Sequence, residues 1–293
     1  MFLLFIFINF PVNELSYSNI LIDLHCHSNI SDGLLSPEEL AHEVFERRIK
    51  IWSLTDHDTT EGLLRAESES KNLNLFFING VEISSTWNDK VIHILGLNID
   101  YKNTLLLNLL EKNRNLREER AFLISKYLDS LGFVGSVDFI LSHLKVCNFI
   151  GRMNFARFLV FKGYCKNIKQ AFSKYLSDKK VGNINTKYPS IDQVIFSIKS
   201  SGGKAFIAHP FKYMFTNNDL YTLMNQFSKL GGDGIEFPLM ANKHNYKLTM
   251  DLITRYNFLI SYGSDFHSHK DDLMTLEKYS SIPNNLKKAW WDS

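Results

Sequence analysis

The segment 20–28, ILIDLHCHS, decides the fold, because an apolar run ends directly in two histidines. The apolar part, residues 20–25, predicts a buried strand. Side chains two residues apart point to the same face of an extended chain, so the imidazoles of His25 and His27 can bind one ion. Cys26 lies between them and is expected to face the opposite side, as a small hydrophobic residue in the core.

Similar clusters of histidine and acidic residues follow other apolar, strand-like runs. The clusters are His25-Cys26-His27, Asp32, Thr55-Asp56-His57-Asp58, Gly80-Val81-Glu82, His93, Ala208-His209-Pro210 and Ser264-Asp265-Phe266-His267. They contain six of the ten histidines; of the other four, His42, His143 and His269 are expected surface or core residues, and His244 is considered below. Strand ends that deliver imidazoles and carboxylates to one rim are typical of a β/α barrel with a multi-metal site.

Nine side chains are candidate metal ligands. They are His25, His27, Asp32, His57, Glu82, His93, His209, Asp265 and His267. Nine donors are too many for one tetrahedral zinc ion and suit two or three divalent ions such as Mn²⁺, Zn²⁺ or Fe²⁺. Such ions lower the pKa of a bound water and hold phosphate oxygens, so the pattern predicts phosphoester hydrolysis.

Three further residues are candidates for orienting these ligands. Asp56, Asp58 and His244 could accept or donate hydrogen bonds to them. For Asp58 a place at a helix N-terminus is the preferred interpretation.

The composition is that of a folded protein and does not by itself indicate a function. The chain has 293 residues, 45% of them hydrophobic, and a formal net charge of +2, which excludes neither an anionic nor a neutral substrate. Its three widely spaced cysteines do not form a disulfide framework and favour a reducing, cytoplasmic location. The apolar run 1–11 is too short to cross a bilayer. It is an extra strand, a poor targeting segment or the result of a start codon placed too early.

The order of strand-like and helix-like segments predicts an α/β barrel with a helical insertion. Strand and helix patterns alternate at both ends of the chain, and Ser36-Pro37 begins the first helix. Between 103 and 180 the pattern is helical throughout, which predicts a lid or small subdomain. The expected division is an apolar extension (1–19), a first barrel part (20–100), the insertion (101–186), a second barrel part (187–270) and a tail (271–293).

The motifs resemble those of the PHP (polymerase and histidinol phosphatase) family, in that family's order. They are Asp-Leu-His-Cys-His-Ser, Ser-Asp-Gly, Leu-Thr-Asp-His-Asp-Thr, Gly-Val-Glu-Ile-Ser, Ala-His-Pro and Gly-Ser-Asp-Phe-His. With Ile-Gly-Arg-Met-Asn-Phe-Ala-Arg (150–157), the chain is most similar to the branch of RNase AM and 3′,5′-nucleoside bisphosphate phosphatase. The resemblance implies a distorted (β/α)7 barrel, a three-manganese site held by the nine ligands, and catalytic activity.

The resemblance also implies the substrates: RNA 5′ ends, with release of 5′ nucleotides and maturation of ribosomal RNA, and nucleoside 3′,5′-bisphosphates. Neither a membrane nor a protein partner is implied. Arg152 and Arg157 are expected to bind substrate phosphate. The chain departs from the branch at Met153 and Asn154, where relatives have proline and histidine, and at 179–183, where a proline-rich stretch is degraded.

Two other functions stay open from the sequence. The same metal site could serve a small phosphomonoesterase such as a histidinol phosphatase. Alternatively, the protein is a metal-bound module without turnover, which loss of one or two ligands would favour. All nine ligands are present, and this favours the enzyme.

Overall fold

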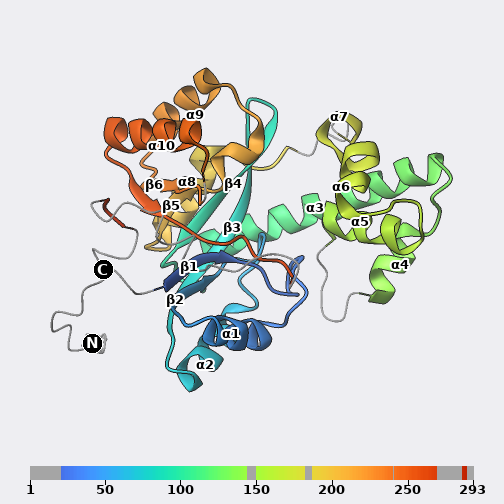
Figure 1. Ribbon diagram of the computed structural model, residues 1–293, viewed down its shortest axis with the longest axis horizontal. Coiled ribbons are helices and arrows are strands. Elements are labelled where there is room, and N and C mark those ends of the chain that lie inside the picture. Colours follow the sequence, from blue (N-terminus) through green and yellow to red (C-terminus); the bar gives the residue numbers. More distant parts are fainter. Residues whose placement is uncertain (1–20, 144–149, 182–186, 240, 269–285, 289–293) are drawn as a thin grey trace.

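The computed structural model describes residues 21–143, 150–181, 187–239, 241–268 and 286–288. The predicted extension 1–19, most of the predicted tail, Cys147 and His269 lie outside this part of the chain. The described residues form a curled seven-stranded sheet with helices around it and a group of helices to one side (Figure 1). The strands, in both chain and sheet order, are β1 (Leu21–Cys26), β2 (Ile49–Leu54), β3 (Phe76–Trp87), β4 (Lys90–Leu97), β5 (Lys204–Ile207), β6 (Gly234–Glu236) and β7 (Leu259–Ser261).

One strand runs against the others. β1, β2 and β3 are parallel to one another, as are β5, β6 and β7, whereas β4 is antiparallel to both of its neighbours. β3 and β4 are joined by the two-residue turn Asn88-Asp89, in which both residues have positive φ, as a tight hairpin requires. This hairpin replaces one strand–helix unit. The predicted distorted barrel is confirmed, with the distortion located here.

Backbone hydrogen bonds join the two ends of the sheet. The chain after β7 returns to β1, where the Leu24 amide donates to the Tyr262 carbonyl (3.0 Å) and the His27 amide donates to the Phe266 carbonyl (2.9 Å). Gly263 makes this approach possible, because a Cβ there would lie 2.2 Å from the Cβ of His25. The closure therefore brings the polar residues that follow β7 against the histidines of β1.

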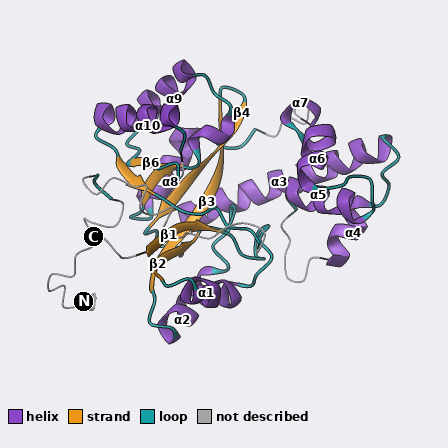
Figure 2. Ribbon diagram, viewed as in Figure 1, coloured by secondary structure: helices purple, strands orange, loops and turns teal. Residues whose placement is uncertain are grey.

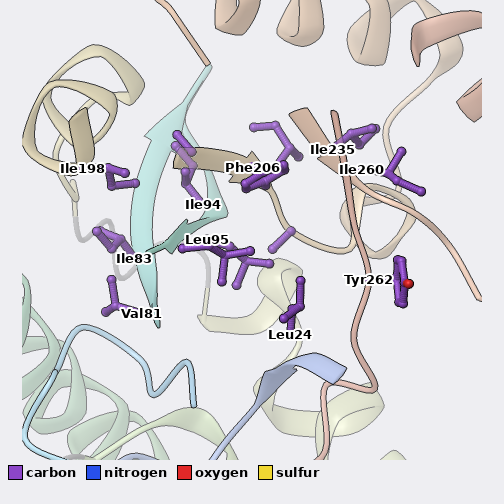
Figure 3. Packing of buried hydrophobic residues seen from close by; sticks show 14 of the residues in the cluster. Leu24, Val81, Ile83, Ile94, Leu95, Ile198, Phe206, Ile235, Ile260 and Tyr262 are labelled. Carbon is purple, nitrogen blue, oxygen red and sulfur yellow. The ribbon is translucent and has the colours of Figure 1, made fainter. Parts of the chain in front are cut away.

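Five helices cover the barrel: α1 (Pro37–Glu46), α2 (Leu63–Asn72), α8 (Ile191–Ser200), α9 (Asn217–Lys229) and α10 (Lys243–Tyr256). Ser36 and Glu39 form the capping box of α1, so the predicted helix start is confirmed. The helices lie around the sheet (Figure 2), and their buried apolar residues belong to one core cluster with those of the strands. Figure 3 shows members of this cluster, among them Ile198 of α8 and Ile83 and Ile94 of the hairpin.

The insertion consists of α3 (Thr104–Ser130), α4 (Ser136–His143), α5 (Arg152–Phe161), α6 (Ile168–Ala171), the π-helical turn η2 (Phe172–Leu176) and α7 (Asp178–Val181). It has a hydrophobic cluster of its own, to which α3 contributes Ala121, Ile124 and Leu128. The first half of the same helix contributes Leu106 and Leu110 to the barrel core. The predicted boundaries of the insertion stay a prediction, since α3 belongs to both clusters.

In the described part of the chain, none of the helices has the length and apolar character that a bilayer crossing requires.

Candidate metal centre

The nine predicted ligands come from six of the seven strands or from the loops after them, and they meet in one place. Seven of them lie on or just after β1, β2, β5 or β7 or in the loop after β1, as the sequence predicts. Glu82 and His93 do not follow strands, because they lie inside β3 and β4. The antiparallel hairpin brings them together, with 2.9 Å between Glu82 Oε1 and His93 Nδ1. The rule that ligands follow strand ends is therefore wrong for these two residues.

Four donor atoms form a compact group. His25 Nε2 lies 3.1 Å from His27 Nε2, so the two histidines share a face as predicted. Glu82 Oε2 lies 3.4 and 3.2 Å from these two nitrogens, and Asp265 Oδ1 lies 3.3 and 3.2 Å from them. Ligands about 2.0 Å from a tetrahedral ion are about 3.3 Å apart. The spacing of these donors thus fits a divalent ion.

Glu82 touches five imidazoles. Oε2 faces His25, His27 and His57, and Oε1 faces His93 and His209, at distances of 2.8–3.4 Å. The carboxylate is fully buried. A buried carboxylate whose two oxygens each face a different set of nitrogens has the geometry of a bridge between two metal positions.

A second group of donors surrounds Asp32. His267 Nε2 lies 3.3 Å from Asp32 Oδ1, and His57 Nε2 lies 3.9 Å from Asp32 Oδ2. Together with His27 they form a set whose potential ligand atoms lie within 4.8 Å of one another. A third such set consists of His57, Glu82 and His93. Three overlapping sets are compatible with more than one ion.

Burial and mutual contacts shift the pKa values of these groups strongly. Burial opposes the charged form of His27, but hydrogen bonds with Asp265 and Glu82 outweigh it and raise its pKa to about 10. Burial also acts against ionisation of Glu82, yet His57 and His93 hold the pKa of this carboxyl well below its ordinary value. Protons on imidazoles thus balance the carboxylates in the absence of cations, and metal binding would displace such protons.

Glu236 is a site residue that the sequence analysis missed. Its Oε1 lies 2.8 Å from His25 Nδ1, and its Oε2 accepts a 2.5 Å hydrogen bond from the His209 amide. A carboxylate on the second nitrogen of a ligating histidine fixes the orientation of the ring. The available signal was a lone acid in the otherwise apolar strand Gly234–Glu236.

Asp56 was a candidate for orienting the metal ligands, and it supports the site through hydrogen bonds to a neighbouring loop. Its carboxylate accepts hydrogen bonds from the Ser28 amide (2.8 Å), the Ser28 hydroxyl (2.6 Å) and the Ser31 hydroxyl (2.6 Å). These bonds fix the loop that carries His27 and Asp32. His244, in contrast, is on α10, where its Nε2 lies 3.3 Å from Asn217 Oδ1.

The preferred interpretation of Asp58 was wrong. α2 begins at Leu63, and Asp58 is fully buried, with its carboxylate 2.5 Å from Arg117 Nε of α3. Asn113 of the same helix donates to Asp58 as well (2.7 Å). Asp58 therefore joins the barrel to the insertion.

Two of the predicted ligands have a backbone in the left-handed region. His209 has φ 27° and Asp265 has φ 55°. Such conformations cost energy for residues other than glycine and are concentrated at functional sites. Here they turn the chain sharply after β5 and β7, which places both side chains over the end of the barrel.

A cavity of about 150 Å³ separates the metal ligands from the insertion; we call it the arginine cavity. Asp32, His57 and His93 border it from the barrel. From the insertion it is lined by Arg117, Arg120 and Arg152. Burial lowers the pKa of Arg120, and the charges of Arg152 and Arg117 add to this effect. Three cations in one cavity favour an anionic ligand.

The predicted phosphate-binding arginines lie in different surroundings. Arg152 lines the arginine cavity, while Arg157 donates a 2.9 Å hydrogen bond from Nη2 to the Asp32 carbonyl. Met153 lines the cavity at the position where relatives are expected to have proline. Asn154 accepts a hydrogen bond from the Gly151 amide (2.9 Å), so it caps α5 instead of facing a ligand. Arg117 and Arg120 were missed because they lie on a helix without a motif.

The fold and site together define a class: barrel proteins whose strands gather histidines and carboxylates into groups that could hold metal ions. The chain belongs to the PHP domain family, whose model matches residues 23–283. This confirms the predicted family.

Similar proteins agree with this assignment. A 5′-3′ exoribonuclease of Haemophilus influenzae is 36% identical over 84% of this chain and 89% of its own length. A 3′,5′-nucleoside bisphosphate phosphatase of Chromobacterium violaceum is 33% identical over 92% of this chain and 95% of its own length. The solved structure of an amidohydrolase from C. violaceum, with bound sulfate and no metal, matches with a TM-score of 0.85 at 33% identity, covering 92% of this chain and 94% of that chain.

Proposed function

We propose that the protein is a metal-dependent phosphoesterase that removes nucleotides from the 5′ end of RNA and hydrolyses nucleoside 3′,5′-bisphosphates. One observation carries the proposal: nine imidazole and carboxylate side chains that could bind metal, with Glu82 among them, meet directly beside the arginine cavity. The relatives named above act on these two kinds of substrate by their names.

The two activities require the same bond cleavage. In a 5′-phosphorylated RNA and in a nucleoside 3′,5′-bisphosphate, the first nucleotide carries a phosphoryl group on O3′. Water adds to that phosphorus, the P–O3′ bond breaks, and O3′ leaves with one of the water protons. The other proton is released with the phosphoryl product, which is free phosphate or the new 5′-phosphate of the shortened RNA. One site can therefore perform both reactions.

The nine ligands would hold three divalent ions, which we propose to be Mn²⁺. When bound, such ions supply a nucleophile at neutral pH and neutralise charge on the phosphoryl oxygens. Asp56 and Glu236 keep the ligands in place through the hydrogen bonds described above. Arg120 and Arg152 would bind the 5′-phosphate through the arginine cavity. Arg157, which bonds the Asp32 carbonyl, would fix this part of the site.

A substrate panel tests the proposal. The Mn²⁺-loaded protein is offered a 5′-monophosphorylated oligoribonucleotide, the same oligonucleotide with a 5′-hydroxyl, a nucleoside 3′,5′-bisphosphate and histidinol phosphate. We expect 5′ mononucleotides from the first substrate, phosphate from the third, and much slower reaction with the other two. Hydrolysis of histidinol phosphate alone would contradict the proposal, as would turnover of none of them.

A matched pair of histidine variants separates the metal site from contaminating nucleases. His25→Ala removes a ligand, so activity is expected to disappear. His42→Ala removes an exposed histidine that pairs with Glu69 on the surface, so activity is expected to persist. Equal activity of the two variants would assign the hydrolysis to another protein.

A further inference from the structure

A second cavity borders the metal ligands; we call it the apolar cavity. Its volume is about 370 Å³, and Phe211, Pro238 and Leu239 are among its lining residues. His209 and Asp265 form its border with the metal centre. Lys212 also lines it; this side chain is 59% exposed and its ammonium pairs with the Asp265 carboxylate. The cavity thus combines apolar walls with one cation, and the carboxylates of Glu236 and Asp265 lie at its edge with the metal centre.

The two cavities approach the metal ligands from different sides. The arginine cavity is bordered by Asp32, His57 and His93, whereas the apolar cavity is bordered by His209 and Asp265, and the two have no lining residue in common. Glu82 contacts ligands on both sides. A phosphoryl group held at the ligands would therefore have one cavity on each side.

The substrates differ in how many of these cavities they can fill. The reacting phosphorus of a nucleoside bisphosphate carries a single nucleoside, attached through O3′. The reacting phosphorus of RNA carries a second nucleoside through O5′. The charged arginine cavity suits the first nucleotide, because only this nucleotide carries a terminal phosphate dianion. The second nucleoside then requires a surface on the other side of the phosphorus.

We propose that the apolar cavity binds this second nucleoside of the RNA, with its base against Phe211 and Leu239 and Lys212 close to the next backbone phosphate. The inference rests on the proposed function and extends it. Bases stack on aromatic and apolar side chains with little dependence on sequence, which suits an exonuclease that must accept any base. The cavity is then the feature that separates RNA from a bisphosphate as a substrate.

The test compares two substrates that differ only in the second base. One is a 5′-phosphorylated dinucleotide, and the other has an abasic ribose in the second position. For the wild-type protein we expect kcat/KM to be about tenfold higher with the base present. Leu239→Trp fills the cavity, so this ratio is expected to fall close to one. Leu64→Trp, which places the same ring on the exposed face of α2, should keep the wild-type ratio.

The outcomes decide separately on the function and on the cavity. Cleavage of both substrates at equal rates by the wild-type protein overturns the inference and leaves the proposed function standing. An unchanged base effect in Leu239→Trp also overturns it. Failure to cleave either dinucleotide overturns the proposed function and the inference with it. If Leu239→Trp does not fold, as judged by circular dichroism, Phe211→Ala replaces it, with the same expected loss of the base effect.

Discussion

The barrel and the helical insertion face each other across the arginine cavity with opposite chemistry. The barrel side carries carboxylates and imidazoles on strands and tight loops, and their charges require cations. The insertion side carries arginines on helices, and apart from Arg117, which pairs with Asp58, their charges favour an anion. A phosphoester with bound divalent ions satisfies both sides at once. The comparison teaches that the candidate metal ligands belong to the barrel, whereas the arginines that favour an anion belong to the insertion.

The two regions also differ in how their polar groups are supported. In the barrel, Asp56 and Glu236 hold the ligands through several short hydrogen bonds. In the insertion, Arg152 donates a long 3.4 Å hydrogen bond to the Leu176 carbonyl and lies over the Phe172 ring. Arg117 is the exception, since it is fixed by Asp58 of the barrel.

The largest effect is expected from breaking the barrel side. Glu82→Gln keeps the shape of the side chain but removes the charge that faces five histidines. We expect kcat/KM to fall at least about a thousandfold on every substrate, and metal content, measured by elemental analysis, to fall as well. Glu69→Gln, at an exposed ion pair, serves as the control. Full metal content with full activity in Glu82→Gln would contradict the inference that Glu82 bridges two metal positions.

The next effect concerns the connection between the two regions. Asp58→Ala removes the carboxylate that faces the buried Arg117 guanidinium, so we expect a loss of about 3–5 kcal/mol in the free energy of unfolding by urea. Glu67→Gln, at the exposed Lys71 pair, is expected to change it by less than about 0.5 kcal/mol. Burial opposes ionisation of Asp58, but Arg117 and Asn113 lower its pKa below the ordinary 3.8.

This lowered pKa fixes the sign of the pH dependence. The stabilisation by Asp58 is complete above its unfolded pKa and is lost as the pH falls through the lower native value. The difference between the wild-type protein and Asp58→Ala should therefore shrink in acid. If the difference in unfolding free energy between the two proteins grows below pH 3.8, Asp58 does not stabilise the native state as a carboxylate paired with Arg117.

A smaller effect is expected from the insertion side. Arg152→Ala removes one charge-assisted contact with the substrate phosphate, so we expect KM to rise about 10- to 100-fold with little change in kcat. Steady-state kinetics on the 5′-phosphorylated oligonucleotide measure it, with Arg255→Ala on the surface of α10 as the control. A loss confined to kcat would place Arg152 in the chemical step instead.

The smallest effect is expected in the pH dependence of metal binding, which tests the balance between protons and cations at the barrel ligands. The pKa of about 10 at His27 means that this imidazole carries a proton at neutral pH without metal and must lose it on binding. Affinity for Mn²⁺ should therefore rise with pH, by about tenfold per unit for each proton released. Calorimetry at several pH values, in buffers with different ionisation heats, measures both the affinity for Mn²⁺ and the number of protons released on binding. Binding without net proton release would contradict the balance described here.

The sequence was most informative in the barrel, and the reasons are local. The capping box at Ser36 and the paired histidines of β1 are short-range patterns, so their structure followed from spacing. The direction of β4 did not, because an alternating strand has the same pattern in either direction. The Asn88-Asp89 turn was the available signal for the hairpin.

The insertion was predictable only as helical. Its arginines gain their meaning from residues far away in the chain, as Arg117 does from Asp58. Glu236 was missed for the same reason, since its partner His25 is 211 positions away. Both apolar and charged cavities depend on packing between such distant segments, which helical periodicity does not encode.

The continuity of α3 has a mechanical consequence. Leu106 and Leu110 anchor its first half in the barrel, and Leu128 anchors its second half in the insertion, without a break in the helix between them. A rotation of the insertion as one body would therefore bend α3 or draw Leu106 and Leu110 out of the barrel core. Removal of 101–186 would also take Leu106 and Leu110 out of the barrel core.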